Sequence, residues 1–273
     1  MSGSRGGTAA NRTADGDAGV ALAEIAGYLD GYLRVDEVPD SPNALNGLQV
    51  ENGGRVARIV AAVDASLEAI EGAENATGPT LLIVHHGLFW NGSIPLTGRR
   101  LRRVRALLER DMALYSAHIP LDVHPDVGNN VVLASQLGIG IEGWWGEHGG
   151  IPIGVWGRPP AALDDRDRLV AELNRLLGTS ARLIPGGPQR TARVGVLTGA
   201  GGSAIAEARD AGLDTLVTGE GAHHTYFDAM ELGVNAVYAG HYATEQVGVQ
   251  ALAQHLSDRF GLPWEFHRHP TGL

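Results

Sequence analysis

Two residue types are missing from this chain, and each absence excludes a class of chemistry. There is no cysteine among the 273 residues, so disulfides, thiolate metal ligands and cysteine nucleophiles are excluded. All 21 basic residues are arginine, which rules out a P-loop lysine, a Schiff-base lysine and a pyridoxal-phosphate anchor. Any metal site in this chain must therefore use nitrogen and oxygen ligands.

Long hydrophobic runs and an excess of basic charge are missing as well. Hydrophobic residues make up 44% of the chain, enough for a core, but no apolar stretch is long enough to cross a bilayer. Residues 1–18 lack the apolar centre of a signal peptide, so we expect a disordered tail and a cytoplasmic protein. The formal net charge of −10 argues against a general nucleic-acid binder.

One basic segment departs from this acidic balance. The stretch from Arg99 to Arg105 is rich in arginine, and Arg110 follows it. The apolar residues of this segment recur at helical spacing: Leu101, Val104, Leu107 and Leu108. Two interpretations stay open, an amphipathic helix with a solvated or subunit-facing basic side and an electrostatic guide for an anionic substrate such as a nucleotide.

Helix-like and strand-like segments alternate along the chain, and a related order occurs twice. The first series predicts helices over 20–33, 66–73 and the arginine-rich segment, and strands over 56–63, 80–84 and 113–116. After a middle segment over 138–188, the second series predicts strands near 192–194, 215–217 and 236–239, and helices over 203–211, 226–232 and 243–256. This pattern predicts an α/β fold with mainly parallel sheets and an internal duplication.

Histidines and carboxylates follow three of these predicted strands. Functional side chains in such sheets gather beyond the carboxyl ends of the strands, so these residues are candidates for one site. A histidine followed at i+4 by a carboxylate presents both groups on one side of a helical turn. The three groups are His85 with His86, His118 with Asp122, and His241 with Glu245. Their ligand types predict a centre for more than one hard or borderline metal ion.

The geometry within these groups leaves alternatives open. Neighbouring residues of a regular strand point to opposite faces, so His85 and His86 reach one site only if the strand ends there, or else each binds a different ion. Pro120 lies between His118 and Asp122, so that turn is not an ordinary helix interior. One of those two residues is a ligand and the other a neighbouring partner, and Asp122 is favoured because two ions need anions.

Other histidines have simpler interpretations. His223 and His224 are either further site residues or solvent-facing residues at a helix start. His124 is interpreted as a loop residue, and His267 and His269 as surface residues.

Five motifs, in order along the chain, resemble those of one known family. Asn46–Val50 matches its NGLQV start, and His85–Trp90 is similar to its HHG-x-FW motif. Ser116–Asp122 resembles its H-x-x-L-D segment, while residues 218–224 and 240–245 resemble its TGE and GH-x-x-TE motifs. Apart from the tail, the whole chain resembles the hexameric dinuclear-metal-centre proteins named GTP cyclohydrolase 1 type 2 homologues, also called NIF-three-like proteins.

The resemblance implies two intertwined, duplicated α/β units with mixed, mainly parallel sheets. The units would comprise residues 19–125 with 236–273 and residues 126–235, with the metal site between them. It also implies a toroidal homohexamer, a trimer of dimers. Two divalent ions would be held by the residues that match the family's ligands: His85, His86, Asp122, His241 and Glu245. His118 would then lie near the ions without binding them.

Five side-chain ligands leave positions to water, which is typical of catalytic rather than structural metal sites. We therefore predict a metal-dependent hydrolase that acts on a C–N or P–O centre of a small molecule. The family name implies GTP. Glu245 would bridge the ions, and Glu220 or His118 would move protons. The ligand types suit Zn, Mn, Fe, Co or Ni.

Two other functions stay open. One is a non-enzymatic metal-binding scaffold or regulatory partner protein. The other is a nucleotide or nucleic-acid binder that uses the arginine-rich helix, which the acidic net charge disfavours.

Overall fold

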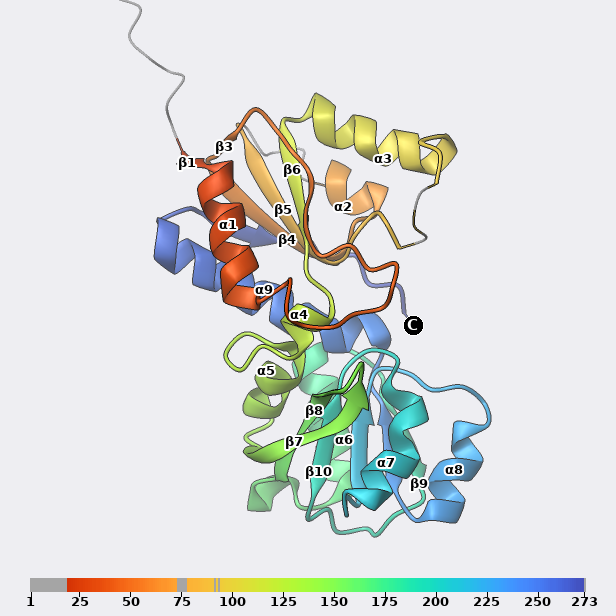
Figure 1. Ribbon diagram of the computed structural model, residues 1–273. Coiled ribbons are helices and arrows are strands. Elements are labelled where there is room, and N and C mark those ends of the chain that lie inside the picture. The colour runs from red at the N-terminus through yellow and green to blue at the C-terminus, as the bar shows by residue number, and fades with distance from the viewer. Residues whose placement is uncertain (1–18, 73–77, 91, 93, 273) are drawn as a thin grey trace, which may run out of the picture.

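A computed structural model describes residues 19–72, 78–90, 92 and 94–272. The expected tail over residues 1–18 lies outside this part of the chain. Its two main sheets, a five-stranded and a six-stranded sheet, carry helices packed against them (Figure 1). In the described part, no helix combines the length and the apolar character needed to span a membrane.

The first sheet has the strand order β13-β4-β5-β6-β2. Its three central strands, β4 (Arg58–Asp64), β5 (Thr80–His86) and β6 (Met112–Ser116), run parallel, and β13 (Trp264–Phe266) joins β4 in the same direction. At the other edge, β2 (Gly47–Val50) pairs with β6 in the antiparallel direction. Beside this sheet, β1 (Val20–Ala21) and β3 (Arg55–Val56) form a short antiparallel pair. Parallel strands here explain the near-continuous apolar runs in the sequence, because both faces are covered.

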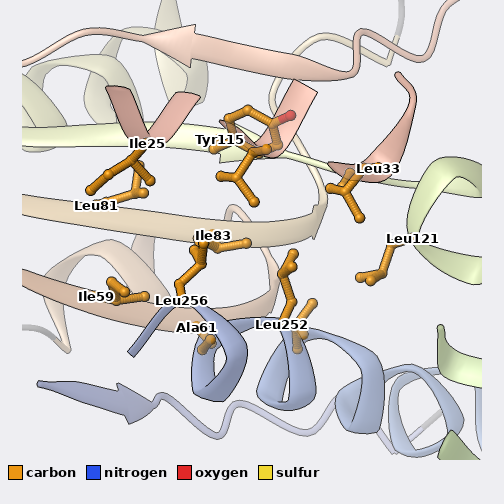
Figure 2. Packing of buried hydrophobic residues seen from close by; sticks show 14 of the residues in the cluster. Ile25, Leu33, Ile59, Ala61, Leu81, Ile83, Tyr115, Leu121, Leu252 and Leu256 are labelled. Atoms are coloured by element: carbon orange, nitrogen blue, oxygen red, sulfur yellow. The ribbon is translucent and has the colours of Figure 1, made fainter. Parts of the chain in front are cut away.

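Alternate residues of these strands enter two different cores. Ile59 and Ala61 of β4 face α1 (Leu22–Leu33) and α9 (His241–Phe260), as Figure 2 shows for the side chains of this cluster. Val60 and Ala62 point to the opposite face, which is covered by α2 (Leu67–Glu71) and α3 (Gly98–Glu109). This alternation is the period of two that a strand imposes.

The second sheet has the order β7-β8-β10-β11-β12-β9. Strands β10 (Val194–Leu197), β11 (Thr215–Thr218) and β12 (Asn235–Tyr238) are parallel, whereas β7 (Gly140–His148), β8 (Ile151–Arg158) and β9 (Arg182–Pro185) are antiparallel to their neighbours. One face packs on α5 (Asn129–Gln136) and α6 (Arg166–Leu177), the other on α7 (Ile205–Asp210) and α8 (Thr225–Leu232). Short helical turns lie at η1 (Ala161–Leu163), η2 (Gly201–Ala204) and α4 (Ile119–Asp122).

The long helix α9 joins the two halves of the molecule (Figure 1). It follows β12 of the second sheet, yet its residues Leu252 and Leu256 belong to the core of the first sheet. Near its start, Val247 packs in the core of the second sheet. The chain therefore crosses back between sheets, and its first turn lies at the boundary where both cores meet.

The predicted α/β fold with mixed, mainly parallel sheets is confirmed, with differences in detail. The sequence pattern missed β7, whose glycines and exposed residues hide the period of a strand. The division into two units stays a prediction. Its boundary at residue 236 falls inside β12, which pairs with β11 and β9, so by pairing the second sheet extends through Tyr238.

Candidate metal centre

Side chains from three chain segments meet between the two sheets. The segments are the carboxyl end of β5, the α4 turn after β6, and the first turns of α9 after β12. Two overlapping groups have ligand atoms within 4.8 Å of one another. One comprises His85, His86 and His118, and the other comprises His86, His241 and Glu245. The cluster thus combines residues that lie far apart in the sequence.

His85 and His86 reach the same centre because β5 ends at them. The next residue is Gly87, and a Cβ there would collide with the side chain of Gln49, whose Oε1 accepts from the amide of Leu88 at 2.8 Å. The two imidazole centroids lie 4.8 Å apart. The Nε2 of His85 is 3.5 Å from Oε1 of Glu245, and the Nε2 of His86 is 3.4 Å from Oε2 of the same residue.

The other two segments bring carboxylates to this point. Within α9, the Nε2 of His241 lies 3.1 Å from Oε1 of Glu245, which is only 3% exposed. From α4, Oδ2 of Asp122 lies 3.6 Å from Nε2 of His85, while its Oδ1 accepts from Asn129 at 2.8 Å. Ligands about 2.1 Å from one ion are separated by about 3.0–3.4 Å. The contacts of His86 and His241 with Glu245 lie in this range, and the two contacts of His85 are slightly longer.

Each of the four imidazoles has its outer nitrogen, Nδ1, held by an oxygen that only accepts hydrogen bonds. Nδ1 must therefore donate, and in the neutral ring Nε2 keeps a bare lone pair, which is the form that binds metal. The acceptors are Ala117 O for His85 (2.9 Å), Asp64 for His86 (2.9 Å), Asp40 for His118 (2.8 Å) and Glu220 for His241 (2.8 Å).

Two buried atoms at the centre have no hydrogen-bond partner within the described residues, Nε2 of His85 and Oε2 of Glu245. Burying such groups unpaired is costly. Their position beside further imidazole and carboxylate atoms fits divalent ions as the missing partners.

The electrostatics of the metal-free cluster reflect its two carboxylates. Burial by itself lowers the pKa of His85, but the charges of Asp122 and Glu245 outweigh it and raise that pKa to about 10. The hydrogen bond to Glu245 raises the pKa of His241 to about 9. Burial opposes ionisation of Glu245, yet the neighbouring His85 and His241 hold its pKa well below the usual range. Burial raises the pKa of Asp122.

His118 occupies a different position from His241. It precedes α4 with non-helical backbone angles, φ −95° and ψ −108°. Pro120 does not break the turn, because it lies in the first turn of α4, where its missing N–H is not needed. The His118 ring lies against Trp90 (4.6 Å between centroids) and hydrogen-bonds Asp40. It belongs to the ligand group of His85 and His86, whereas Asp122 belongs to neither of the two groups and approaches the centre through His85.

A cavity of about 480 Å³ opens from this cluster. Five residues of the candidate centre line it: His86, His118, Asp122, His241 and Glu245. The other walls come from the β7–β8 hairpin and from the residues that follow β10. Trp90, the last residue of the HHG-x-FW motif, forms part of the wall.

Two residues that hold site histidines were not predicted from the sequence, and the positions of some other histidines were left open or predicted wrongly. Asp40 and Asp64 orient site histidines, but only Asp64, a carboxylate at a strand end, had a signal that could have identified it. His223 and His224 are exposed beside α8 and outside the cavity. The expectation of a surface position for His267 is wrong, because its side chain is largely buried and its ring hydrogen-bonds the carbonyl of Ala69.

Both the sequence and the fold of this chain match a known family. Residues 20–270 match the family model described as Duf34/NIF3 (NGG1p interacting factor 3), and the chain belongs to this family. It is 44% identical over 250 residues to the GTP cyclohydrolase 1 type 2 homolog of Deinococcus radiodurans, covering 92% of this chain and 94% of that protein. The protein of the same name from Pyrococcus abyssi is 44% identical over 252 residues, with 92% and 98% covered.

A solved structure is also similar. The protein TTHA1606 from Thermus thermophilus superposes with a TM-score of 0.83 at 40% identity, covering 93% of this chain and 100% of that one. The resemblance inferred from the five motifs is confirmed by these matches.

Proposed function

We propose that this chain binds two divalent metal ions and is a metal-dependent hydrolase. The observation that carries the proposal is the orientation of four imidazoles, each with Nδ1 tied to an acceptor and Nε2 left for the centre. His85, His86, Asp122, His241 and Glu245 would hold the ions, and the carboxylate of Glu245 lies within 3.5 Å of all three of these imidazoles. The donor set suits Zn, Mn, Fe, Co or Ni.

Bound divalent ions would supply Lewis acidity and lower the pKa of water near neutrality. The residues of the chain would do the rest. Asp122 and Glu245 offset positive charge and fix the spacing of the imidazoles. His118 lines the cavity with its Nδ1 held by Asp40, an arrangement suited to moving a proton at Nε2. Glu220 contacts the outer nitrogen of His241, so it acts through that ring.

The substrate class we propose is a small molecule with a cyclic C–N bond, or else a phosphoester. The name of the relatives, GTP cyclohydrolase 1 type 2 homolog, supports the first. The cavity volume of about 480 Å³ is within the range for small-molecule sites.

Metal analysis and a turnover screen test this function together. Purified protein should hold about two divalent ions per chain, as expected for a bridging carboxylate between two sites. The reconstituted protein should open GTP, another cyclic amide or a phosphoester. His241→Ala should lose metal and turnover, whereas His223→Ala, an exposed histidine outside the cavity, should lose neither.

The outcomes separate the alternatives. Absence of bound metal, or full activity of His241→Ala, would reject the hydrolase. Two bound ions without turnover on any substrate would favour a metal-binding scaffold instead.

We also propose that the chain assembles as a homohexamer, as the family resemblance implies. Large apolar side chains exposed on α3 and α8 support burial in an assembly: Leu101, Leu108, Tyr226, Phe227 and Met230. Light scattering or native mass spectrometry of the purified protein tests it, and a monomer would reject it.

A further inference from the structure

A fully buried asparagine links the candidate ligand Asp122 to the long helix α9. Asn129, the first residue of α5, has no exposed surface. Its Nδ2 donates to Oδ1 of Asp122 at 2.8 Å, and its Oδ1 accepts from the amide of Gly248 in α9 at 2.7 Å. One side chain therefore joins a candidate ligand of α4 to the helix that carries His241 and Glu245.

The two partners of this carboxamide leave it only one orientation. A backbone amide always donates, so the atom of Asn129 that faces Gly248 must be the oxygen, and the nitrogen then faces Asp122. Oδ1 of Asp122 is thus engaged by an N–H donor. Oδ2, which lies 3.6 Å from Nε2 of His85, is the oxygen that is left for an ion.

The close approach of Asn129 to α9 depends on Gly248. A Cβ added to Gly248 would lie 2.4 Å from Oδ1 and 2.8 Å from Cγ of Asn129, which is closer than real Cβ contacts. Gly248 lies inside the helix and has no positive φ, so its backbone conformation does not require glycine. Glycine is less favourable than alanine inside a helix. The room that Gly248 leaves for Asn129 explains why a glycine is found there.

We propose that Asn129 is a positioning residue for the metal centre, which holds Asp122 so that one carboxylate oxygen reaches an ion. Gly248 provides the space that this contact needs. Partners behind a ligand fix its orientation and strengthen metal binding. This inference rests on the proposed metal centre and adds to it two residues that lie outside the five motifs of the family resemblance.

Metal titration of two matched variants tests the role of Asn129. Asn129→Leu keeps the approximate shape of the side chain and removes the donor to Asp122. Asn235→Leu makes the same change at another fully buried asparagine, at the start of β12. The hydrogen-bond partners of Asn235 lie outside the candidate centre: Arg166, Gly187, Pro188 and Thr215.

Both leucine variants should unfold at a lower temperature than the unaltered protein, because each leaves buried polar partners unsatisfied. Only Asn129→Leu should also weaken metal binding. The affinity for one of the two ions should fall by about tenfold or more, and the affinity for the other by less than about threefold, because Asn129 acts on Asp122 alone. A general loss of structure would weaken both ions alike.

Gly248→Ala tests the same contact from the side of α9 and keeps the test open if Asn129→Leu does not fold. The added methyl group should displace Asn129 and weaken the same ion by about tenfold. Added to Asn129→Ala, which removes the two side-chain atoms that it would meet, the substitution should cause no further loss of affinity. Gly27→Ala is the control, because an added Cβ at this position of α1 meets nothing within 4 Å.

Three results would overturn the inference: equal metal affinities of Asn129→Leu and Asn235→Leu, equal weakening of both ions in Asn129→Leu, or unchanged metal binding in Gly248→Ala. Unaltered protein that binds no metal would reject the proposed centre together with the inference. Turnover is recorded separately in the same samples. The predicted differences in metal affinity without turnover of any substrate would reject the hydrolase and leave the role of Asn129 standing.

Discussion

Two segments of this chain have the same spacing of histidine and carboxylate but different geometry. In His241–Glu245, the histidine is the first residue of a twenty-residue helix, and its Nε2 lies 3.1 Å from the carboxylate four residues later. In His118–Asp122, the histidine precedes a four-residue helix and has non-helical backbone angles. Its ring hydrogen-bonds Asp40, while Asp122 approaches His85.

The difference shows that a spacing of i+4 predicts a shared ligand site only when both residues are inside the helix. The i+4 rule depends on helical rotation between the two side chains. His118 itself has non-helical backbone angles, and its ring turns to Asp40 while Asp122 approaches His85. The following predictions test this asymmetry, beginning with the largest expected effect.

Loss of Glu245 should remove both metal ions, whereas loss of Asp122 should remove one. Glu245→Gln keeps the shape of the side chain but removes the negative charge that lies next to His85, His86 and His241. Bound metal should fall from about two ions per chain to nearly none, and in Asp122→Asn to about one. Metal analysis of both variants checks this. Equal losses of bound metal would contradict the predicted difference between the two segments.

Gly199 should be required for the position of Glu245. Its φ is +70°, and an added Cβ would collide with Oε1 of Glu245. Gly261 has nearly the same φ, +69°, with nothing near an added Cβ, and so controls for backbone strain. Both alanine variants should lose about 1 kcal/mol of folding stability from the strained backbone.

Only Gly199→Ala should also bind metal more weakly, by about tenfold or more, on the order seen when ligands lose support. Denaturant unfolding and metal titration measure the two effects. Equal metal affinity of Gly199→Ala and Gly261→Ala would contradict the assignment.

The carboxylates that hold Nδ1 of His241 and Nδ1 of His118 should differ in their effect on metal affinity. Glu220→Ala frees the ring of His241 and should lower metal affinity by about tenfold. Asp40→Ala frees the ring of His118 and should change metal affinity by less than about threefold while reducing turnover. A loss of metal affinity in Asp40→Ala as large as that in Glu220→Ala would contradict this difference.

The smallest effect concerns a histidine near the far end of α9. Two carboxylates raise the pKa of His241, whereas burial and the charge of Arg259 lower the pKa of His255. A lowered folded-state pKa means that His255 disfavours its protonated form, so its contribution to stability is present at neutral pH and lost as pH falls below about 6.5.

Over this pH range the raised pKa values of His85 and His241 act in the opposite direction in metal-free protein, so the contribution of His255 is measured as a difference between variants. Relative to its value at about pH 7.5, the unfolding midpoint at about pH 5.5 should be about 1–2 °C higher in His255→Gln than in the unaltered protein. Thermal unfolding at both pH values measures this, and an equal change in both proteins would show that His255 does not contribute.

Much of the fold and most of the site were predictable from local sequence. The apolar runs before His85, His118 and His241 predicted parallel strands, and the strand ends predicted where the polar residues gather. The residues whose oxygens accept hydrogen bonds from the site histidines were harder to predict from the sequence. Asp40 lies in a proline-rich loop with no periodic pattern, and its contact with His118 bridges 78 residues. The exposed and glycine-rich β7, which forms a cavity wall, also carried no clear strand period.

Short stretches of sequence were enough to predict the candidate ligand types, the alternation of strands and helices, and the family. Local rules suffice there, because side-chain chemistry and hydrophobic period are properties of short segments. The folded chain was needed to show that α9 crosses between sheets and carries Glu245 to His85 and His86. It was also needed to show that His118 turns to Asp40, because that contact depends on packing between segments far apart in the chain.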